Sequence, residues 1–364
     1  VMVASSPASA AATYTFYASG SAVGTTAPGL AKDYTLNLTN LNTSASISFN
    51  LGIAASPVGW TTQLSQTSLT VAASTTQQVT LTVRPPSTAL ADSVGQYVNV
   101  TATPDDNTTA QTVATTTRVT EVFGVALTLI PQGGTSGDPG QNITWLGYIQ
   151  NTGNSQQTYT VSVNNTSYTS TNLTTNLVTV SPGDTRVVQV TINLSTTAPV
   201  GVLYSRIAAT STANSSVTDS KEFSATVNAK RAVGLFGLTF DDLRASTESE
   251  STVTLRNIIV ENRGNVADGY TLLGTANASR HGDWVSFVSN SISLPAFTQR
   301  YLNVTVTVPA SVTQTGDYTV EFRIISDNST AVIAFLNLTI TITAKHDLSM
   351  VYDSLVAKQS GDPG

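Results

Sequence analysis

Three short segments, each beginning with an asparagine, recur in this chain at a constant interval of 111 residues. They are residues 40–43 (NLNT), 151–154 (NTGN) and 262–265 (NRGN), and the last two match closely. A turn-forming segment upstream recurs in the same phase, as residues 25–29 (TTAPG) and 135–140 (TSGDPG). Self-similarity at a fixed period is typical of repeat proteins, whose sequence specifies a repeated shape before any chemistry. We therefore interpret the chain as one module used three times.

The turn segment returns once more as residues 359–364 (QSGDPG), which indicates the beginning of a fourth copy. Each full copy has about 110 residues, which is near the commonest domain size and enough to bury a core. The segment VMVASSPASAAA at the start resembles the end of a signal peptide. We therefore expect five parts: residues 1–12 as a signal-peptide remnant or N-terminal strand, 13–120, 121–230 and 231–345 as domains, and 346–364 as the start of a fourth repeat or a donated strand.

Apolar and β-branched polar residues alternate in many short stretches, such as residues 78–83 (QVTLTV), 187–192 (VVQVTI) and 302–306 (LNVTV). This period of two predicts strands with one face in a core and the other in water. No stretch has a helical pattern, and turn signals separate the strands. About seven short strands in each repeat predict an all-β fold of three tandem immunoglobulin-like β-sandwiches. Because the joining segments are short, we expect the sandwiches to form a stiff rod, followed by the first strand of an incomplete fourth repeat.

The second repeat carries a series of short motifs: residues 151–154 (NTGN), 159–161 (YTV), 180–184 (VSPGD), 188–192 (VQVTI) and 199–201 (PVG). In this order they resemble the NEW3-type immunoglobulin-like domain of secreted and surface-layer-associated prokaryotic proteins. The first and third repeats carry looser copies. The resemblance implies a sandwich fold and an extracellular location, and it implies no catalytic residues, because the family shares none.

The composition excludes several classes of protein. Only 10% of residues are charged, the net charge is −6 and the pI is about 4.8, so nucleic acid is not an expected partner. No run of 18 apolar residues occurs, so we expect no membrane span in these residues. The chain has no cysteine, which excludes disulfides, thiolate metal sites and cysteine nucleophiles.

Fourteen of the asparagines begin an Asn-X-Ser/Thr sequon, about twice the number that the Ser and Thr content would give by chance. This excess predicts a secreted protein with N-linked glycans. The alternative is that Thr and Asn are simply abundant in its strands and turns. The candidates are Asn37, Asn42, Asn99, Asn107, Asn142, Asn164, Asn165, Asn172, Asn193, Asn214, Asn277, Asn303, Asn328 and Asn337.

The sequence offers little that could perform a reaction. The only histidines, His281 and His346, are far apart, and no metalloprotease or nucleophile-elbow motif is present. Acidic residues form no pair with the features of glycosidase carboxylates. We therefore expect no catalytic residue and no enzymatic activity.

Two weaker candidates concern metals and sugars. Asp241 and Asp242 could begin a calcium site near a joint, but calcium needs six to eight oxygens, and solvated turn acids are the simpler interpretation. We therefore expect no cofactor other than glycans, with calcium as the one candidate metal. Trp60, Trp145 and Trp284 could stack on sugars, although packing in or beside a core is the more common role of tryptophan. The strand predicted for residues 143–148 favours a core role for Trp145 in particular.

Two segments are candidates for strand exchange between copies of the chain. Residues 347–352 (DLSMVY) would supply Leu348, Met350 and Tyr352, and the first strand would supply Tyr14 and Phe16. A strand added to the edge of a neighbouring sheet would build head-to-tail polymers. The plainer interpretation of residues 347–352 is the boundary of the sequence itself.

These features together predict a non-enzymatic, glycosylated structural protein outside the cell. It would be a subunit of a filament, pilus or surface layer, with copies of itself and other envelope proteins or glycans as partners. Its low charge and its sequons would suit an archaeal envelope. The alternatives are the accessory region of a larger secreted hydrolase, in contact with carbohydrate or serving as a spacer, and an adhesin.

Overall fold

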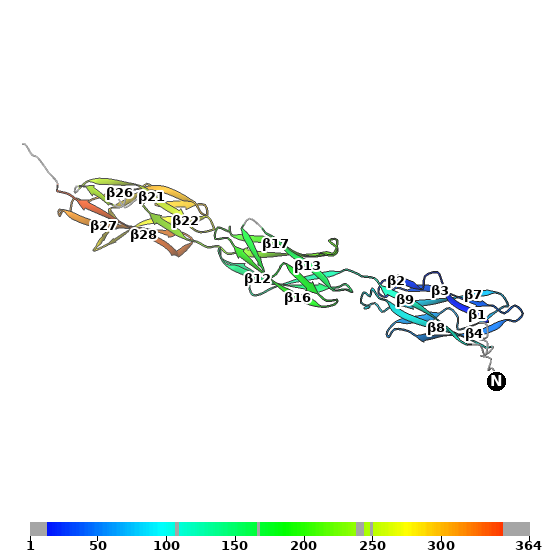
Figure 1. Cartoon of the computed structure of the whole chain (residues 1–364). Helices are drawn as coiled ribbons and strands as arrows, with labels where there is room; N and C mark the ends of the chain where they lie inside the picture. Colours follow the sequence, from blue (N-terminus) through cyan, green and yellow to red (C-terminus); the bar gives the residue numbers. More distant parts are fainter. Residues whose placement is uncertain (1–12, 106–108, 166–167, 238–243, 248–249, 345–364) are drawn as a thin grey trace, which may run out of the picture.

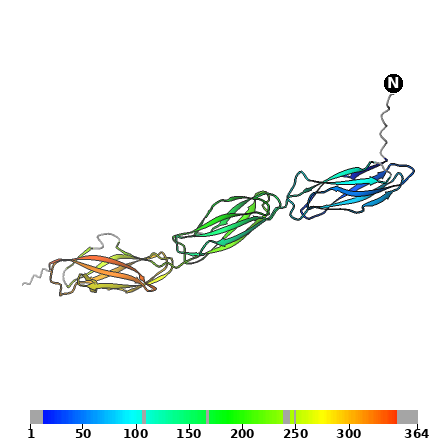
Figure 2. The same ribbon diagram turned by 90° about the horizontal axis from the view of Figure 1, so that it is seen from below.

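The computed structural model describes residues 13–105, 109–165, 168–237, 244–247 and 250–344. Three β-sandwiches lie end to end along an extended axis, and two perpendicular views agree on this arrangement (Figure 1, Figure 2). The described residues contain no α-helix, and their one helical element is the 3-10 turn η2 (Gly282–Trp284). The predicted all-β fold of tandem sandwiches is confirmed. Within the described part of the chain, no helix has the length and apolar character needed to cross a membrane.

The first module packs a four-stranded sheet on a five-stranded sheet. The four-stranded sheet has the order β1 (Tyr14–Ser19), β3 (Lys32–Asn40), β7 (Thr76–Arg84) and β5 (Thr61–Leu64). The other sheet has the order β2 (Val23–Thr26), β9 (Gln111–Val119), β8 (Gln96–Pro104), β4 (Ile47–Ala55) and β6 (Ser68–Val71). All these pairs are antiparallel except β2 with β9.

The second module has the same two-sheet plan. Its first sheet has the order β10 (Val125–Pro131), β12 (Asn142–Asn151), β16 (Thr185–Leu194) and β14 (Thr169–Leu173). Its second sheet has the order β11 (Ser136–Gly137), β18 (Thr218–Val227), β17 (Gly201–Ser211), β13 (Gln157–Asn164) and β15 (Leu177–Val180). The short strand β11 again runs parallel to the last strand of its module.

The third module repeats the plan with one addition. Its first sheet has the order β19 (Val233–Phe236), β21 (Thr252–Asn262), β26 (Gln299–Thr307) and β24 (Val285–Phe287). Its second has the order β20 (Arg244–Thr247), β28 (Ser329–Ile342), β27 (Gly316–Ser326), β22 (Asp268–Asn277) and β23 (Arg280–His281), and β25 (Ser291–Leu294) also pairs with β22. The addition is the hairpin of β22 and β23 with η2, whose backbone passes so close to β22 that Gly274 and Gly282 have no room for a Cβ atom.

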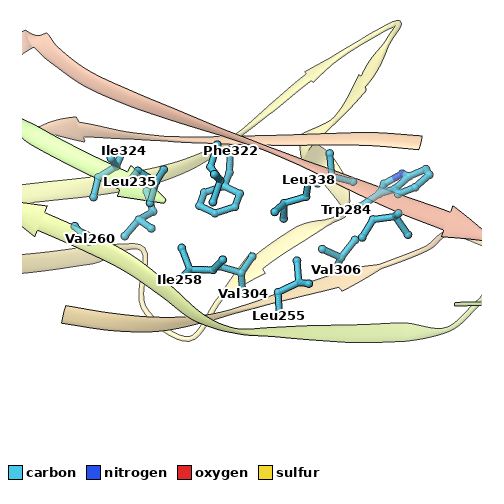
Figure 3. Packing of buried hydrophobic residues seen from close by; sticks show 14 of the residues in the cluster. Leu235, Leu255, Ile258, Val260, Trp284, Val304, Val306, Phe322, Ile324 and Leu338 are labelled. Atoms are coloured by element: carbon cyan, nitrogen blue, oxygen red, sulfur yellow. The ribbon is translucent and has the colours of Figure 1, made fainter. Parts of the chain in front are cut away.

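Each sandwich has its own apolar core, formed by the inward-facing residues of both sheets. The alternation predicted from the sequence is visible in β3, where Tyr34, Leu36 and Leu38 are buried between less buried neighbours. Figure 3 shows the same arrangement in the third module, where Val260 and Val304 face Phe322 and Leu338 across the core. With no cysteine in the chain, this packing holds each pair of sheets together without a disulfide.

The connections between modules are short. At the first joint, β9 ends at Val119 and β10 begins at Val125. At the second joint, β18 ends at Val227 and β19 begins at Val233. The expected boundaries at residues 120 and 230 fall inside these connections.

Candidate functional sites at the joints and on the exposed faces

The repeated asparagine that defines the period is part of the framework of each module. The side chains of Asn40, Asn151 and Asn262 are 0% exposed. In each case Nδ2 donates hydrogen bonds to at least two backbone carbonyls, and Oδ1 accepts one from the backbone N–H two residues later. Every polar atom of the buried amide is therefore paired, so this residue fixes a turn and is not a reactive group.

A second asparagine, three residues later, forms the first joint. Oδ1 of Asn154 accepts a hydrogen bond from the backbone N–H of Val122 (2.7 Å), and Nδ2 donates to the carbonyls of Thr120 (3.0 Å) and Ala89 (3.2 Å). The backbone carbonyl of Asn154 accepts from the N–H of Ala91 (2.9 Å). One residue of module two thus binds both the connecting segment and a loop of module one.

The second joint has the same set of bonds. Oδ1 of Asn265 accepts from the N–H of Lys230 (2.7 Å), and Nδ2 donates to the carbonyls of Asn228 (2.9 Å) and Ala198 (3.1 Å). Its carbonyl accepts from the N–H of Val200 (3.5 Å). We call this arrangement the asparagine clamp. The repeated segment is evident in the sequence, but the role of its fourth position is not.

The surroundings of the two clamps differ in chemistry. A cleft of about 510 Å³ adjoins the first clamp, and none of the residues that line it is charged. Leu30, Leu90 and Val122 are 61%, 62% and 42% exposed there. The second joint carries Lys230 and Arg263 at the positions that correspond to Val122 and Thr152. The hydrogen bonds of the joint are thus constant while its surface varies.

The second joint also contains a buried acidic group. The carboxylate of Asp268 lies 3.7 Å from Nε of Arg231, which belongs to the connecting segment, and it accepts hydrogen bonds from Ser326 Oγ and Asn328 Nδ2 (both 2.7 Å). Burial, followed by the negative charge of Asp268, raises the pKa of Tyr270 to about 12. These contacts tie the connecting segment to the third module in addition to the clamp.

The structure separates the asparagines of sequons from the others. Thirteen of the predicted glycosylation positions lie in the described residues and none of them is buried, whereas Asn107 lies outside the described residues. Among the residues that the structure describes, the buried asparagines are those of the framework and the clamps, and none of these begins a sequon: Asn40, Asn151, Asn154, Asn262 and Asn265. Sequons therefore occupy the surface that a glycosylating enzyme can reach.

The second module gathers several sequons on one face. Asn142 and Asn193 are directly opposite each other on β12 and β16, and Asn193 is also opposite Ser170 on β14. Asn172 is two residues further along β14 and faces the same way. Neighbouring positions of this kind have Cβ atoms roughly 5 Å apart. Glycans on this face would therefore crowd one another.

The three tryptophans have different environments. Trp145 and Trp284 are 7% and 5% exposed and belong to the cores of their modules, as Figure 3 shows for Trp284. With so little of each ring exposed, neither offers a whole ring face to a sugar, although an edge of Trp145 lines a recess with Lys221 and Glu222. Trp60 is only half-buried and lines a recess beside the first joint, with Asp92 and Gln96 nearby. The core role favoured for Trp145 from its strand agrees with its burial, whereas nothing in the sequence separates Trp60 from Trp284.

The candidates for metal binding and strand exchange receive no support from the described residues. Asp241 and Asp242, together with Leu348, Met350 and Tyr352, lie outside them, as does His346. The described part of the chain contains no group of three residues that could hold a metal. Tyr14 and Phe16 are buried in the core of their own module, where β1 pairs with β3.

The third module contains an ion pair with one buried partner, which the sequence does not reveal. Arg280, on the added hairpin, contacts the carboxylate of Glu321, which is 2% exposed on the outer side of β27. Oε1 of Glu321 has no hydrogen-bond partner among the described residues. His281 beside it stacks on Trp284 with ring centroids 4.3 Å apart. Its ring also lies edge-on to Tyr318, with ring centroids 5.5 Å apart, so the histidine packs among aromatic side chains at the border of the core.

A family model described as "NPCBM-associated, NEW3 domain of alpha-galactosidase" matches residues 26–104. This confirms the NEW3 resemblance for the first module, whereas the motifs that predicted it were clearest in the second. No curated protein matches the sequence.

Several solved structures are similar at low identity. Extracellular cadherin domains 1–5 of protocadherin gamma B2 are 9% identical, and the match covers 89% of this chain and 59% of that one with a TM-score of 0.44. A FixG-related protein from Vibrio parahaemolyticus is 13% identical and covers 29% of this chain and 99% of its own, with a TM-score of 0.26. A protein of unknown function from Porphyromonas gingivalis W83 is 12% identical, and the match covers 60% of this chain and 99% of that one with a TM-score of 0.25.

Proposed function

We propose that this chain is a non-enzymatic, N-glycosylated structural protein outside the cell. In this proposal it is a stiff subunit of a filament, pilus or surface layer that assembles from copies of itself and contacts other envelope components. The observation that carries the proposal is the asparagine clamp, which occurs with the same hydrogen bonds at both joints.

A clamp of this kind restricts bending because the connecting segment has little freedom left. In the first joint, Thr120 donates its N–H to Thr26 of module one, and Thr152 of module two donates its N–H to Gly124. Between these points Asn154 holds the segment from the side. Module motion would break several of these bonds at once. A protein that sets a fixed distance needs such joints, whereas a flexible tether does not.

The distribution of sequons supports the location. Exposed sequons occur on strands of both sheets, as at Asn142 on β12 and Asn164 on β13 in the second module. A coat of glycans on both faces suits a protein exposed to the outside and leaves little bare sheet for a substrate. The N-linked glycans would be its only covalent additions.

The stiffness is tested by distance measurements between spin labels. The chain has no cysteine, so Ala114→Cys in β9 and Ser162→Cys in β13 place one label on each of the first two modules without background labelling. We expect one narrow distance peak by double electron–electron resonance. Asn154→Ala should broaden it, and Asn176→Ala, which removes an exposed asparagine of the same module, should not. A broad peak in the unaltered joint would contradict the proposal.

Assembly and glycosylation need protein from its native cells. Electron microscopy should show ordered fibres or lattices, and peptide mass spectrometry should find glycans at the exposed sequons. Isolated short rods without glycans would contradict both parts.

The second candidate is the accessory region of a secreted hydrolase. The match to a domain named after alpha-galactosidase favours it. This candidate requires a glycosidase domain in the same native polypeptide, which peptide mapping of the intact protein would reveal.

A further inference from the structure

The recess beside Trp60 lies on module one at its joint with module two. Its volume is about 340 Å³, within the range of roughly 300–1,000 Å³ that ligand pockets occupy. Trp60 follows the β4–β5 turn, which is closed by a hydrogen bond from its N–H to the carbonyl of Pro57 (3.2 Å). Part of the indole packs against the core of the module, and the remainder lines the recess.

The opposite wall of the recess is the loop that the clamp holds. Ala89 and Ala91 line the recess, and both are bonded to Asn154 of the second module. Asp92 follows them, and its N–H donates to the carbonyl of buried Val119 (3.1 Å). The recess is therefore preformed, and the second module fixes one of its walls.

The polar groups of the recess are fixed as well. Oδ1 of Asp92 accepts hydrogen bonds from the N–H groups of Val94 (2.8 Å) and Gly95 (3.0 Å), and Oδ2 accepts one from Gln96 Nε2 (2.8 Å). The bond from Gly95, and then that from Gln96, lowers the pKa of Asp92. The carboxylate is thus ionised, and Gln96 keeps one N–H and its Oε1 for a ligand.

This combination selects a class of ligand. An aromatic ring beside a carboxylate and an amide offers an apolar platform next to hydrogen-bond donors and acceptors. A pyranose ring has the matching pattern, with C–H groups on one face and hydroxyls at the rim. No basic residue lines the recess, although Arg118 is near enough to help lower the pKa of Asp92. The ionised Asp92 in its wall disfavours phosphates and acidic sugars. At the corresponding point of the second joint, Val200 is followed by Gly201, which offers no side chain.

We propose that this recess binds a neutral pyranose residue of a glycan, with one ring face on Trp60 and hydroxyls on Asp92 and Gln96. The inference stands apart from the proposed rod, because the rod could be stiff and glycosylated without binding any sugar. The bound residue would lie at a fixed position between the first two modules.

The test uses the full chain made without glycosylation. Binding of methyl glycosides of glucose, galactose, mannose and N-acetylglucosamine is measured by saturation-transfer NMR and titration calorimetry. At least one should bind, and methyl glucuronide should bind less well. Trp60→Ala and Gln96→Ala should each weaken binding, the former by about tenfold or more.

Two variants keep the result interpretable. Gln96 is exposed, and within the described residues the one hydrogen bond of its side chain goes to Asp92, so Gln96→Ala should fold even where Trp60→Ala does not. Tyr97→Ala removes an exposed aromatic side chain that does not line the recess and should bind as the unaltered protein does. The proposal is wrong if no neutral glycoside binds, if glucuronide binds best, or if Gln96→Ala leaves affinity unchanged.

Discussion

Replacing Asn151 by alanine should destabilise the second module and leave the other two unchanged. The amide donates to the carbonyls of Ser155 (2.7 Å) and Val180 (3.0 Å) and accepts from the N–H of Gly153 (2.9 Å). Each such bond contributes about 1 kcal/mol net, and its loss leaves a backbone group unpaired. We therefore expect the free energy of unfolding of this module to fall by about 3 kcal/mol, which corresponds to more than a 100-fold change in its opening equilibrium.

Hydrogen exchange with mass spectrometry measures the stability of each module separately in the intact chain. Core amides of β13 and β16 should exchange more than 100-fold faster in Asn151→Ala, and amides of the first and third modules should not change. Asn40→Ala and Asn262→Ala should do the same in their own modules, and Asn176→Ala is the matched surface control. A loss below about 1 kcal/mol, or one spread over all modules, would refute the structural role of the repeated amide.

Asn151→Asp separates hydrogen bonding from shape. The carboxylate keeps the acceptor for Gly153 but has no donors, so it faces the carbonyls of Ser155 and Val180 with a negative charge. At neutral pH Asn151→Asp should lower the free energy of unfolding of the second module at least as much as Asn151→Ala does. If Asp were tolerated as well as Asn, packing and not hydrogen bonding would explain the repeat.

Three further predictions concern single contacts. Burial raises the pKa of Asp219, but hydrogen bonds from the N–H groups of Leu127 and Ser220, together with the charge of Lys221, outweigh this and leave the pKa below its usual value. The stability that this carboxylate contributes is present above about pH 4 and is lost as the pH falls through the folded pKa. The free energy of unfolding of Asp219→Asn should therefore fall less steeply with acid than that of the unaltered protein. Gly282→Ala should destabilise the third module by about 2 kcal/mol in thermal unfolding, because the new Cβ would overlap the backbone of β22. Arg280→Ala should cost about 2 kcal/mol by leaving Glu321 buried without its partner, and Glu321→Gln in the same chain should recover most of that loss, as chemical denaturation would measure.

The fold could be predicted from the sequence because both of its signals are local or periodic. The two-residue alternation marks strands such as β16, and the recurrence of Asn40, Asn151 and Asn262 marks one turn of each module. The short connection between modules also follows from the spacing. The spacing does not give the orientation of the side chains. The sequence NTGN does not indicate that the first asparagine points into its own module and the second toward the neighbouring one.

The details of the surface could not be predicted for a related reason. The alternating stretch around Trp145 favours a core role, but Trp60 and Trp284 look alike in the sequence, and only the three-dimensional position of the β4–β5 turn leaves Trp60 at an edge. Asp92 and Gln96 reach the same recess from 32 and 36 residues further along the chain. The ion pair of Arg280 and Glu321 depends on the added hairpin, which the other two modules lack, so the repeat pattern could not predict it.

The clamp and the recess are linked by a single residue, and this gives stiffness a second consequence. Asn154 holds the loop of Ala89 and Ala91 through its side chain and its backbone, and that loop is one wall of the recess beside Trp60. A wall that is already ordered loses little conformational freedom when a ligand arrives, so less of the interaction energy is spent on ordering. By the same linkage, a ligand that contacts this wall favours the clamped joint over any bent one. Binding at the first joint should therefore straighten the rod further, and the second joint, where Gly201 stands in the place of Asp92, should be indifferent to it.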